Sequence, residues 1–498
     1  MVSSQPVTPE NKYGKKRVTR SIAWKLMERL SFLAVTLIMN FILARLLEPE
    51  AFGLIALVNV FITFSSIFVS GGLSNALIQK VDADETDFSS VFWLNLGVSA
   101  VLYLLIFIFA PIMSNAMGYP ALSPVLRVLG IKLFFAAFNA IQTAFISKNM
   151  MFRPYFFSTL VARVLSAIFG VLLAFLGYGV WALVAQSISM LVIEVFVLFF
   201  IVRWRPKIIF IWQRAKNIYS FAVKLMATSL IEITNQQVRS VVIGVKFSSV
   251  DLAYYDKGIL LPNSFVTNIS SSLSSVMFPV VSAQQHEVPK VSSTLRRWIG
   301  LFCYTTFPIL FGMIITADPL IPLFFSDKWL PSVPFFRIAC AAFLVWAIEV
   351  PIKETLKALG FATACLRIQM IKTGVALLSL ACAATISVFA VTLTTLLVNL
   401  ISFLLSMYYA RKHINYSWKN LFSDVHQTLI LSAIMCLSIY FIPNLFTSRL
   451  LILLAQVVIA VIVYVAASII IKNRHFSTLK KLLLVLVSSK KEEGSLFP

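Results

Sequence analysis

The sequence is short of charge, and of acidic charge above all. Only 12% of its 498 residues are charged, with 20 Asp and Glu against 42 Lys and Arg, while 59% are hydrophobic and the mean hydropathy is +0.90. A soluble domain has about 25% charged residues. A chain with half that share cannot cover a water-exposed surface, so we expect lipid to be its solvent.

Residues that carry chemistry are also scarce. The five cysteines form no CxxC pair, and the four histidines never stand at the spacing of metal ligands. Gly14-Lys15-Lys16 lacks the upstream glycine of a phosphate-binding loop. We therefore expect no enzymatic activity, no metal and no cofactor. We expect no cleavable signal peptide either, because the first apolar run leads into further apolar runs.

Long apolar runs predict an all-α polytopic membrane protein with about 14 transmembrane helices, since one such helix needs about 20 apolar residues. The alternating pattern of a transmembrane β-barrel is absent. The predicted spans are 21–45, 51–77, 88–113, 122–147, 154–176, 178–202, 217–244, 252–280, 295–317, 331–352, 363–386, 389–410, 424–443 and 449–471.

The distribution of basic residues tests this topology. With the N-terminus in the cytoplasm, 28 Lys and Arg fall on the cytoplasmic side and 4 on the opposite side. Cytoplasmic loops carry such an excess of basic residues. The split predicts a multi-pass protein of the cytoplasmic (inner) membrane with both termini in the cytoplasm. It also assigns most of the net charge of +22 to topology rather than to nucleic-acid binding.

The chain contains a weak internal repeat. Residues 42–53 resemble 242–253, and 70–74 resemble 270–274, which predicts a parallel repeat with six spans in each copy. The predicted parts are a basic cytoplasmic tail (1–20), an N-terminal six-helix bundle (21–202), a basic cytoplasmic linker (203–216), a C-terminal six-helix bundle (217–410), two additional spans (411–471) and a cytoplasmic tail (472–498) with a short interfacial helix at Leu482–Val487.

Polar residues inside spans mark the candidate site, because an ionisable group in a membrane needs a cavity or a partner. At 100° per residue, the predicted seventh span carries five polar groups within an arc of about 80°. They are Lys224, Thr228, Glu232, Asn235 and Arg239. Two cations and one anion favour the lining of a positively charged cavity. The alternative is a polar seam that only joins helices.

The first span has a similar face, formed by Lys25, Arg29, Thr36 and Asn40, with Glu28 beside it. Lys25 and Arg29 are also placed to snorkel to the interface. Lys372 in the eleventh span is a further cavity candidate. Arg163 and Glu194 lie at similar depths in adjacent spans, which predicts a structural ion pair.

Several segments, in order, resemble bacterial polysaccharide flippases of the multidrug/oligosaccharidyl-lipid/polysaccharide exporter superfamily. The resemblance covers roughly residues 20–410 and is closest to the colanic-acid and teichuronic-acid exporter branch. The segments that carry it are Ile42-Leu43-Ala44-Arg45-Leu46-Leu47-Glu48-Pro49-Glu50-Ala51-Phe52-Gly53-Leu54, Gly71-Gly72-Leu73 through Ile78-Gln79, Gly179-Val180-Trp181-Ala182-Leu183-Val184, Trp204-Arg205-Pro206, Leu273 through Phe278-Pro279, and Phe324 through Lys328-Trp329.

The resemblance implies a V-shaped pair of pseudo-symmetric six-helix bundles that works by alternating access. It implies undecaprenyl-pyrophosphate-linked oligosaccharide repeat units as substrate, for lipopolysaccharide or other surface polysaccharide biosynthesis. The implied partners are this lipid-linked oligosaccharide, membrane lipids, a polysaccharide polymerase and a chain-length regulator, with no nucleic acid. Two alternatives stay open: a drug or cation antiporter of the same superfamily, and a membrane glycosyl-polymerase or ligase.

Overall fold

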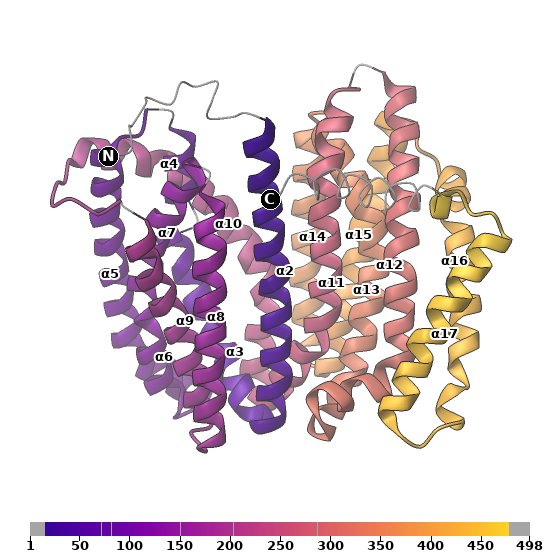
Figure 1. The fold of residues 1–498 in the computed structure, drawn as a ribbon, viewed down its shortest axis with the longest axis horizontal. Helices are drawn as coiled ribbons and strands as arrows, with labels where there is room; N and C mark the ends of the chain where they lie inside the picture. The colour runs from indigo at the N-terminus through magenta and orange to yellow at the C-terminus, as the bar shows by residue number, and fades with distance from the viewer. Residues whose placement is uncertain are drawn as a thin grey trace, which may run out of the picture. The chain divides into compact units, whose positions relative to one another are not determined.

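The computed structural model describes residues 15–70, 72–80, 82–149, 151–202, 204–285 and 287–477, and within these ranges it contains helices and no strand (Figure 1). Some side chains inside the helices, including Lys25 and Lys224, lie outside the description. The longer helices are α2 (Lys15–Leu46), α3 (Pro49–Ser70), α5 (Glu85–Met117), α7 (Lys132–Lys148), α8 (Phe152–Phe175), α9 (Val180–Ile201), α10 (Trp212–Lys246), α11 (Ser249–Ser282), α12 (Val288–Phe325), α13 (Val333–Ala358), α14 (Ala362–Ala383), α15 (Val388–Ile414), α16 (Trp418–Tyr440) and α17 (Arg449–Ile470). The short helices are α4 (Leu73–Gln79), α6 (Leu122–Gly130), η1 (Asp327–Ser332) and η2 (Ile442–Asn444).

The all-α polytopic fold class is confirmed. In the described part of the chain, 13 helical segments are long and apolar enough to cross a membrane, and they match 13 of the predicted spans. The remaining prediction, 217–244, lies within the continuous 35-residue helix α10. This helix is absent from the 13 apolar segments, in keeping with its many polar residues.

Three predicted spans differ from the observed helices, and one of them, 122–147, is divided into α6 and α7 at Ile131. The first helix begins at Lys15, so that it includes part of the predicted tail, of which residues 1–14 lie outside the description. The predicted span 51–77 is not one helix, because α3 ends at Ser70 and α4 begins at Leu73. Gly72 lies in this break against the backbone of α10, where a Cβ atom would come within 2.4 Å of the Ala222 carbonyl oxygen. The predicted interfacial helix Leu482–Val487 lies outside the described residues.

By its internal contacts the chain divides into two units, Met1–Ala253 and Tyr254–Pro498. We call these unit 1 and unit 2 and describe each by itself. The division falls after α10 rather than in the predicted linker 203–216, because α10 packs on α3, α4 and α5 of unit 1. The grouping of spans into two six-helix bundles stays a prediction.

In unit 1 the two corners singled out as a repeat pack against each other. A Cβ atom on Gly53 of α3 would lie 1.7 Å from the Ser249 carbonyl oxygen, and one on Gly244 would lie 2.3 Å from Leu57. The Tyr119 hydroxyl joins them by donating to the Gly244 carbonyl (3.3 Å) and accepting from the Ser249 amide (2.8 Å). Only glycine permits so close an approach of two helices.

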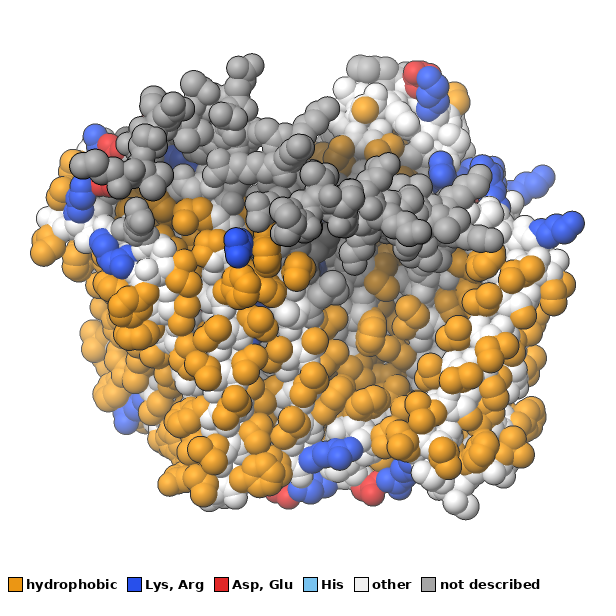
Figure 2. Space-filling view, viewed as in Figure 1, with side chains coloured by type: hydrophobic (Ala, Val, Ile, Leu, Met, Phe, Trp, Pro, Cys, Tyr) orange, Lys and Arg blue, Asp and Glu red, His pale blue; other side chains and the backbone are white. Residues whose placement is uncertain are grey.

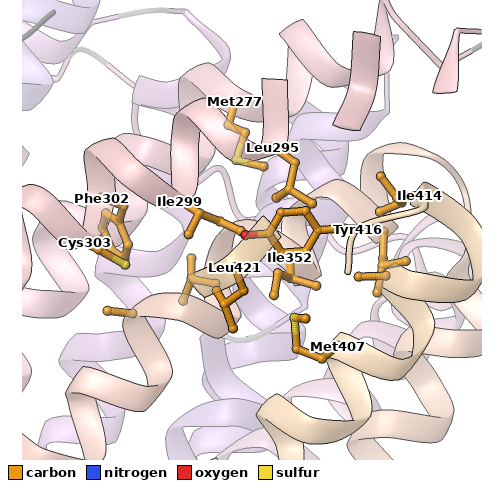
Figure 3. Packing of buried hydrophobic residues seen from close by; sticks show 14 of the residues in the cluster. Met277, Leu295, Ile299, Phe302, Cys303, Ile352, Met407, Ile414, Tyr416 and Leu421 are labelled. Atoms are coloured by element: carbon orange, nitrogen blue, oxygen red, sulfur yellow. The ribbon is translucent and has the colours of Figure 1, made fainter. Parts of the chain in front are cut away.

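Unit 2 is built around α12, which packs on α13, α16 and α17. Its core is formed by buried aliphatic and aromatic side chains of α11, α12, α13, α15 and α16, and Tyr416 lies at its centre (Figure 3). The two additional spans α16 and α17 therefore belong to this unit. Arg296 of α12 fastens the first of them by a two-pronged contact with Asp424, at 2.7 to 3.1 Å.

Contacts between loops agree with the predicted alternation of spans. Lys148 donates to backbone carbonyls of the loop at 80–83, so the loops after the predicted second and fourth spans share one end of unit 1. In unit 2, Arg449 meets Asp327 at 2.5 Å and joins two loops predicted to be external. On the face drawn in Figure 2, hydrophobic side chains cover the helices and charged ones lie mainly toward their ends.

Reporter fusions test which end faces the cytoplasm. Fusions after Lys207 and Arg411 should report the cytoplasm, and fusions after Tyr119 and Asp327 the external side, because basic residues gather at the first two sites. A fusion after His286, outside the described residues, should also report the cytoplasm. Paired alkaline phosphatase and fluorescent-protein fusions measure both sides. A clear inversion at any one site would overturn the fourteen-span topology.

Candidate functional site

The polar residues predicted on the seventh span lie on one continuous helix, α10. Glu232 is exposed on the surface of unit 1, and Arg239 and Asn235 are half-buried. The Asn235 amide donates to the Ile231 carbonyl one turn back, at 3.0 Å. The opposite side of the helix carries the buried Ala222 and Met226, which join a hydrophobic cluster of unit 1. The helix thus has one buried apolar side and one polar side.

The polar face of α2 is only partly described. Arg29 is exposed and Asn40 is half-buried, with its amide donating to the Thr36 carbonyl at 2.9 Å. The Lys25 and Lys224 side chains lie outside the described residues. The structure therefore places five predicted site residues of unit 1, Arg29, Asn40, Glu232, Asn235 and Arg239, without placing the two lysines.

The Glu28 side chain of α2 contacts α8 and is not part of this polar face. Its carboxylate lies 3.8 Å from the Arg163 guanidinium. Arg163 also stacks on Phe32, one helical turn beyond Glu28, at 3.7 Å from the ring centre. The sequence predicted Glu194 as the ion-pair partner of Arg163. Helix α8 packs on both α2 and α9, and the carboxylate within ion-pair distance of Arg163 is Glu28 of α2.

Glu194 completes a buried polar cluster. It is 4% exposed and interacts with the Asn139 side chain of α7 and, through charge, with Arg163. A cavity of about 170 Å³ opens beside the cluster and is lined by Glu28, Thr143 and Tyr155 among others. Two carboxylates thus share one guanidinium inside a membrane-spanning unit, which is a costly arrangement unless the groups hold one another.

Lys132 is a residue that the sequence analysis overlooked. It is the first residue of α7, directly after the break that separates α6 from α7, and its ammonium donates to the Ser187 hydroxyl of α9 at 2.7 Å. On α7, Lys132, Asn139 and Thr143 share one face at 100° per residue. The available signal was a lysine in the middle of an apolar run.

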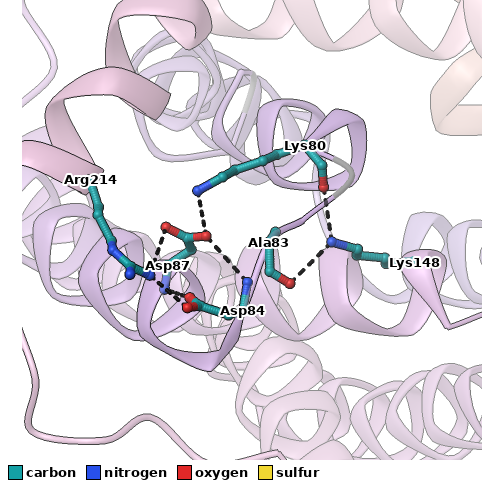
Figure 4. A network of polar contacts seen from close by, with 6 residues as sticks. All are labelled: Lys80, Ala83, Asp84, Asp87, Lys148 and Arg214. Atoms are coloured by element: carbon teal, nitrogen blue, oxygen red, sulfur yellow. Dashed lines mark hydrogen bonds and ion pairs between the residues drawn. The ribbon is translucent and has the colours of Figure 1, made fainter. Parts of the chain in front are cut away.

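A second charged network lies at the end of unit 1 where α5 begins (Figure 4). Asp84 and Asp87 form a capping box at this helix start, Lys80 contacts Asp87 at 2.5 Å, and Arg214 contacts Asp84 at 2.6 Å. The Arg214 hydrogen bond lowers the pKa of Asp84 to about 2. Asp84 therefore stays charged at any physiological pH, and its contact with Arg214 ties the first turn of α10 to the start of α5.

In unit 2, Lys372 is half-buried on α14. A stronger polar feature, also missed from the sequence, is Glu349 of α13, whose side chain is fully buried. Its carboxylate accepts from the Ser402 hydroxyl at 2.5 Å and lies 3.4 Å from Lys353. In the described residues, no group of His, Cys, Asp and Glu is arranged to hold a metal ion. The charged groups of unit 1 and unit 2 described above interact with one another through ion pairs and hydrogen bonds.

Comparison with known proteins adds independent evidence. Residues 42–334 match a family described as "Polysaccharide biosynthesis protein". The succinoglycan biosynthesis transport protein ExoT of Rhizobium meliloti is 26% identical over 63% of this chain and 64% of its own length. The teichuronic acid biosynthesis protein TuaB of Bacillus subtilis is 23% identical over 60% of this chain and 62% of its own length. The matches thus span less than two thirds of these relatives.

A solved structure of the lipid II flippase MurJ, in an inward closed conformation, is similar in fold. Its TM-score is 0.71 at 17% sequence identity, and the match covers 90% of this chain and 98% of that one. The likeness confirms the fold predicted from the spans.

The Arg163 contact gives a direct test of the buried cluster. Arg163→Met should leave Glu28 and Glu194 without their cation, and breaking a buried pair costs about 3–5 kcal/mol. We expect a large loss of membrane abundance and of thermal stability in detergent. The double change Arg163→Met with Glu28→Gln should recover much of both. Arg297→Met, at an exposed position, is the control. If the protein with Arg163→Met alone were as stable as the parent, the proposed role of the ion pair would be wrong.

Proposed function

Since the chain belongs to the polysaccharide biosynthesis protein family, we propose that it flips undecaprenyl-pyrophosphate-linked oligosaccharide repeat units across the cytoplasmic membrane for surface polysaccharide biosynthesis. Helix α10 carries the proposal. It takes the place of the seventh span, yet it presents Glu232 exposed and Arg239 half-buried on one side. Hydrocarbon does not solvate such groups. A water-filled path or a polar ligand must therefore meet this face.

The charge of these faces suits an anionic headgroup. The polar sides of α2 and α10 carry the cations Lys25, Arg29, Lys224 and Arg239. Two carboxylates lie near these cations, Glu28 on α2 and Glu232 on α10. Glu28 pairs with Arg163 at 3.8 Å, so that Glu232 is the carboxylate left to offset the cations. A cation in a low-dielectric site attracts a pyrophosphate far more strongly than one in water. Alternating access would let the headgroup pass between cationic positions.

The two alternatives have less support. An antiporter of organic cations needs carboxylates to line its path, whereas α2 and α10 carry more cations than anions. A glycosyl-polymerase or ligase needs a catalytic loop outside the membrane, whereas the described residues connect their helices by short segments. The two named relatives are a succinoglycan biosynthesis transport protein and a teichuronic acid biosynthesis protein, which supports a transport role in polysaccharide biosynthesis.

Loss of the protein tests the proposed function directly. Lipid-linked repeat units should accumulate in the cytoplasmic leaflet of a deletion strain while their synthesis continues, because the units lack a route across. Leaflet-specific labelling of the oligosaccharide measures this, with complementation by the intact chain as control. Normal arrival of the units in the outer leaflet, in a strain without a second flippase, would refute the proposal.

Charge substitutions on α10 test the path. We expect Arg239→Glu and Lys224→Glu to abolish transport without loss of protein, because each places a carboxylate opposite a pyrophosphate, and Arg239→Lys to keep part of it. Glu232→Gln distinguishes two roles of this carboxylate. Transport that no longer depends on an ion gradient would indicate ion coupling, whereas loss of folded protein would indicate an internal ion pair. Lys412→Glu, at an exposed position of α15, is the matched control. Transport at the parent rate by both reversals, measured by complementation at equal expression, would show that the polar face serves packing only.

A further inference from the structure

We propose that a groove on unit 1, between α3, α5 and the segment before α10, binds one acyl chain of an anionic membrane phospholipid. The groove has a volume of about 600 Å³ and an almost wholly apolar lining. Its walls include Phe68 of α3, Trp93 and Val101 of α5, and Phe210. The inference concerns a bound lipid that is not the transported substrate, so it stands apart from the proposed function.

The groove is open because of a glycine. Gly97 lies on its α5 wall, and no atom comes within 4 Å of the position that a Cβ atom would occupy. Helix α5 belongs to a membrane-spanning segment, so the space is filled by hydrocarbon rather than by water. Because position 97 is a glycine, the groove along α5 stays open, whereas a larger side chain at this position would fill it.

The length of the groove fits one leaflet. From Trp93 to Leu102 it follows α5 for nine residue steps, or about 14 Å at 1.5 Å per residue. Half of a hydrocarbon core is about 15 Å thick. A phospholipid chain entering from the nearer surface has this reach, whereas an undecaprenyl chain is several times longer. The dimensions therefore favour a phospholipid over the lipid carrier of the substrate.

The wall formed by Phe210 is fixed in place before any lipid binds. The Trp93 indole donates to the Lys207 carbonyl at 2.9 Å. The Ser89 and Ser90 hydroxyls accept from the amides of Lys207 and Ile211, both at 3.1 Å. These bonds hold the segment along the first turns of α5. They also hold Ile208, 93% exposed, and Trp212, 59% exposed, with their side chains outward at this end of the unit. Exposed aromatic and aliphatic residues at a helix end are typical of the membrane interface.

Charge at the same end favours an anionic headgroup. The segments 80–87 and 204–216, together with Lys148, carry six cations and four carboxylates. Several of these groups pair with one another in the network of Figure 4, but a surplus of positive charge remains. Lys216 is exposed there, and Lys207, which is also exposed, pairs with Glu85 at 2.5 Å. Lysines near a membrane surface attract anionic lipids.

The test measures lipid retained by the purified full-length protein. After exchange into detergent with defined lipid, we expect the parent to retain phosphatidylglycerol in preference to phosphatidylcholine, as counted by native mass spectrometry. Gly97→Phe displaces at least two methylene groups from the groove, which predicts about tenfold weaker retention. Gly374→Phe is the matched control, since Gly374 of α14 also has no atom within 4 Å of its Cβ position.

A second measurement keeps the inference falsifiable if Gly97→Phe fails to fold. Phosphatidylglycerol with a photoreactive acyl chain should label the parent at peptides containing Trp93 or Phe210. Equal retention by Gly97→Phe and parent, or labelling elsewhere only, would overturn the proposal. Equal retention of phosphatidylcholine would overturn the choice of an anionic lipid. Displacement of the label by equimolar undecaprenyl phosphate would assign the groove to the substrate carrier instead, and none of these outcomes depends on transport activity.

Discussion

Hydrocarbon offers no hydrogen-bond partners, and this constraint bears on how polar groups are placed in the described spans. Backbone groups are satisfied within helices. Many hydroxyls in the spans are satisfied in the same way: Ser99 and Thr306 each donate to a carbonyl one turn back, at 2.9 and 2.7 Å. Ionisable side chains need a partner from a second helix, as Arg163 has in Glu28 and Lys132 has in Ser187. Buried charge therefore lies where helices meet.

The same constraint sets how closely the helices pack. Without a hydrophobic drive between helices in lipid, association depends on close contact through small residues. Gly53 and Gly72 provide it in unit 1, where their backbones meet those of α11 and α10. The break between α3 and α4 coincides with one of these contacts. Gly72, at this break, is thus a site of close helix packing in the structure.

Features set by local composition were predictable from the sequence, and features set by a choice among partners were not. Span positions follow from runs of apolar residues, which is why 13 of them recur as helices apolar enough to cross a membrane. The partner of Arg163 does not follow, because Glu28 and Glu194 both lie within its electrostatic reach, and only the three-dimensional structure shows that Glu28 is the carboxylate 3.8 Å away. Glu349 was missed for a similar reason. Its hydrogen-bond partner Ser402 lies 53 positions away, on α15.

Helix α10 is the place where these arguments meet. Its buried side is settled by packing on α3, α4 and α5, with Ile218, Ala222 and Met226 in a hydrophobic cluster. Its other side combines Ile231, 56% exposed, with the exposed Glu232. A helix that faced lipid here would be apolar throughout this side, and a helix that only joined its neighbours would bury the carboxylate against a partner. An exposed carboxylate with a half-buried guanidinium two turns away agrees with the proposal that this face of α10 meets water or a charged ligand.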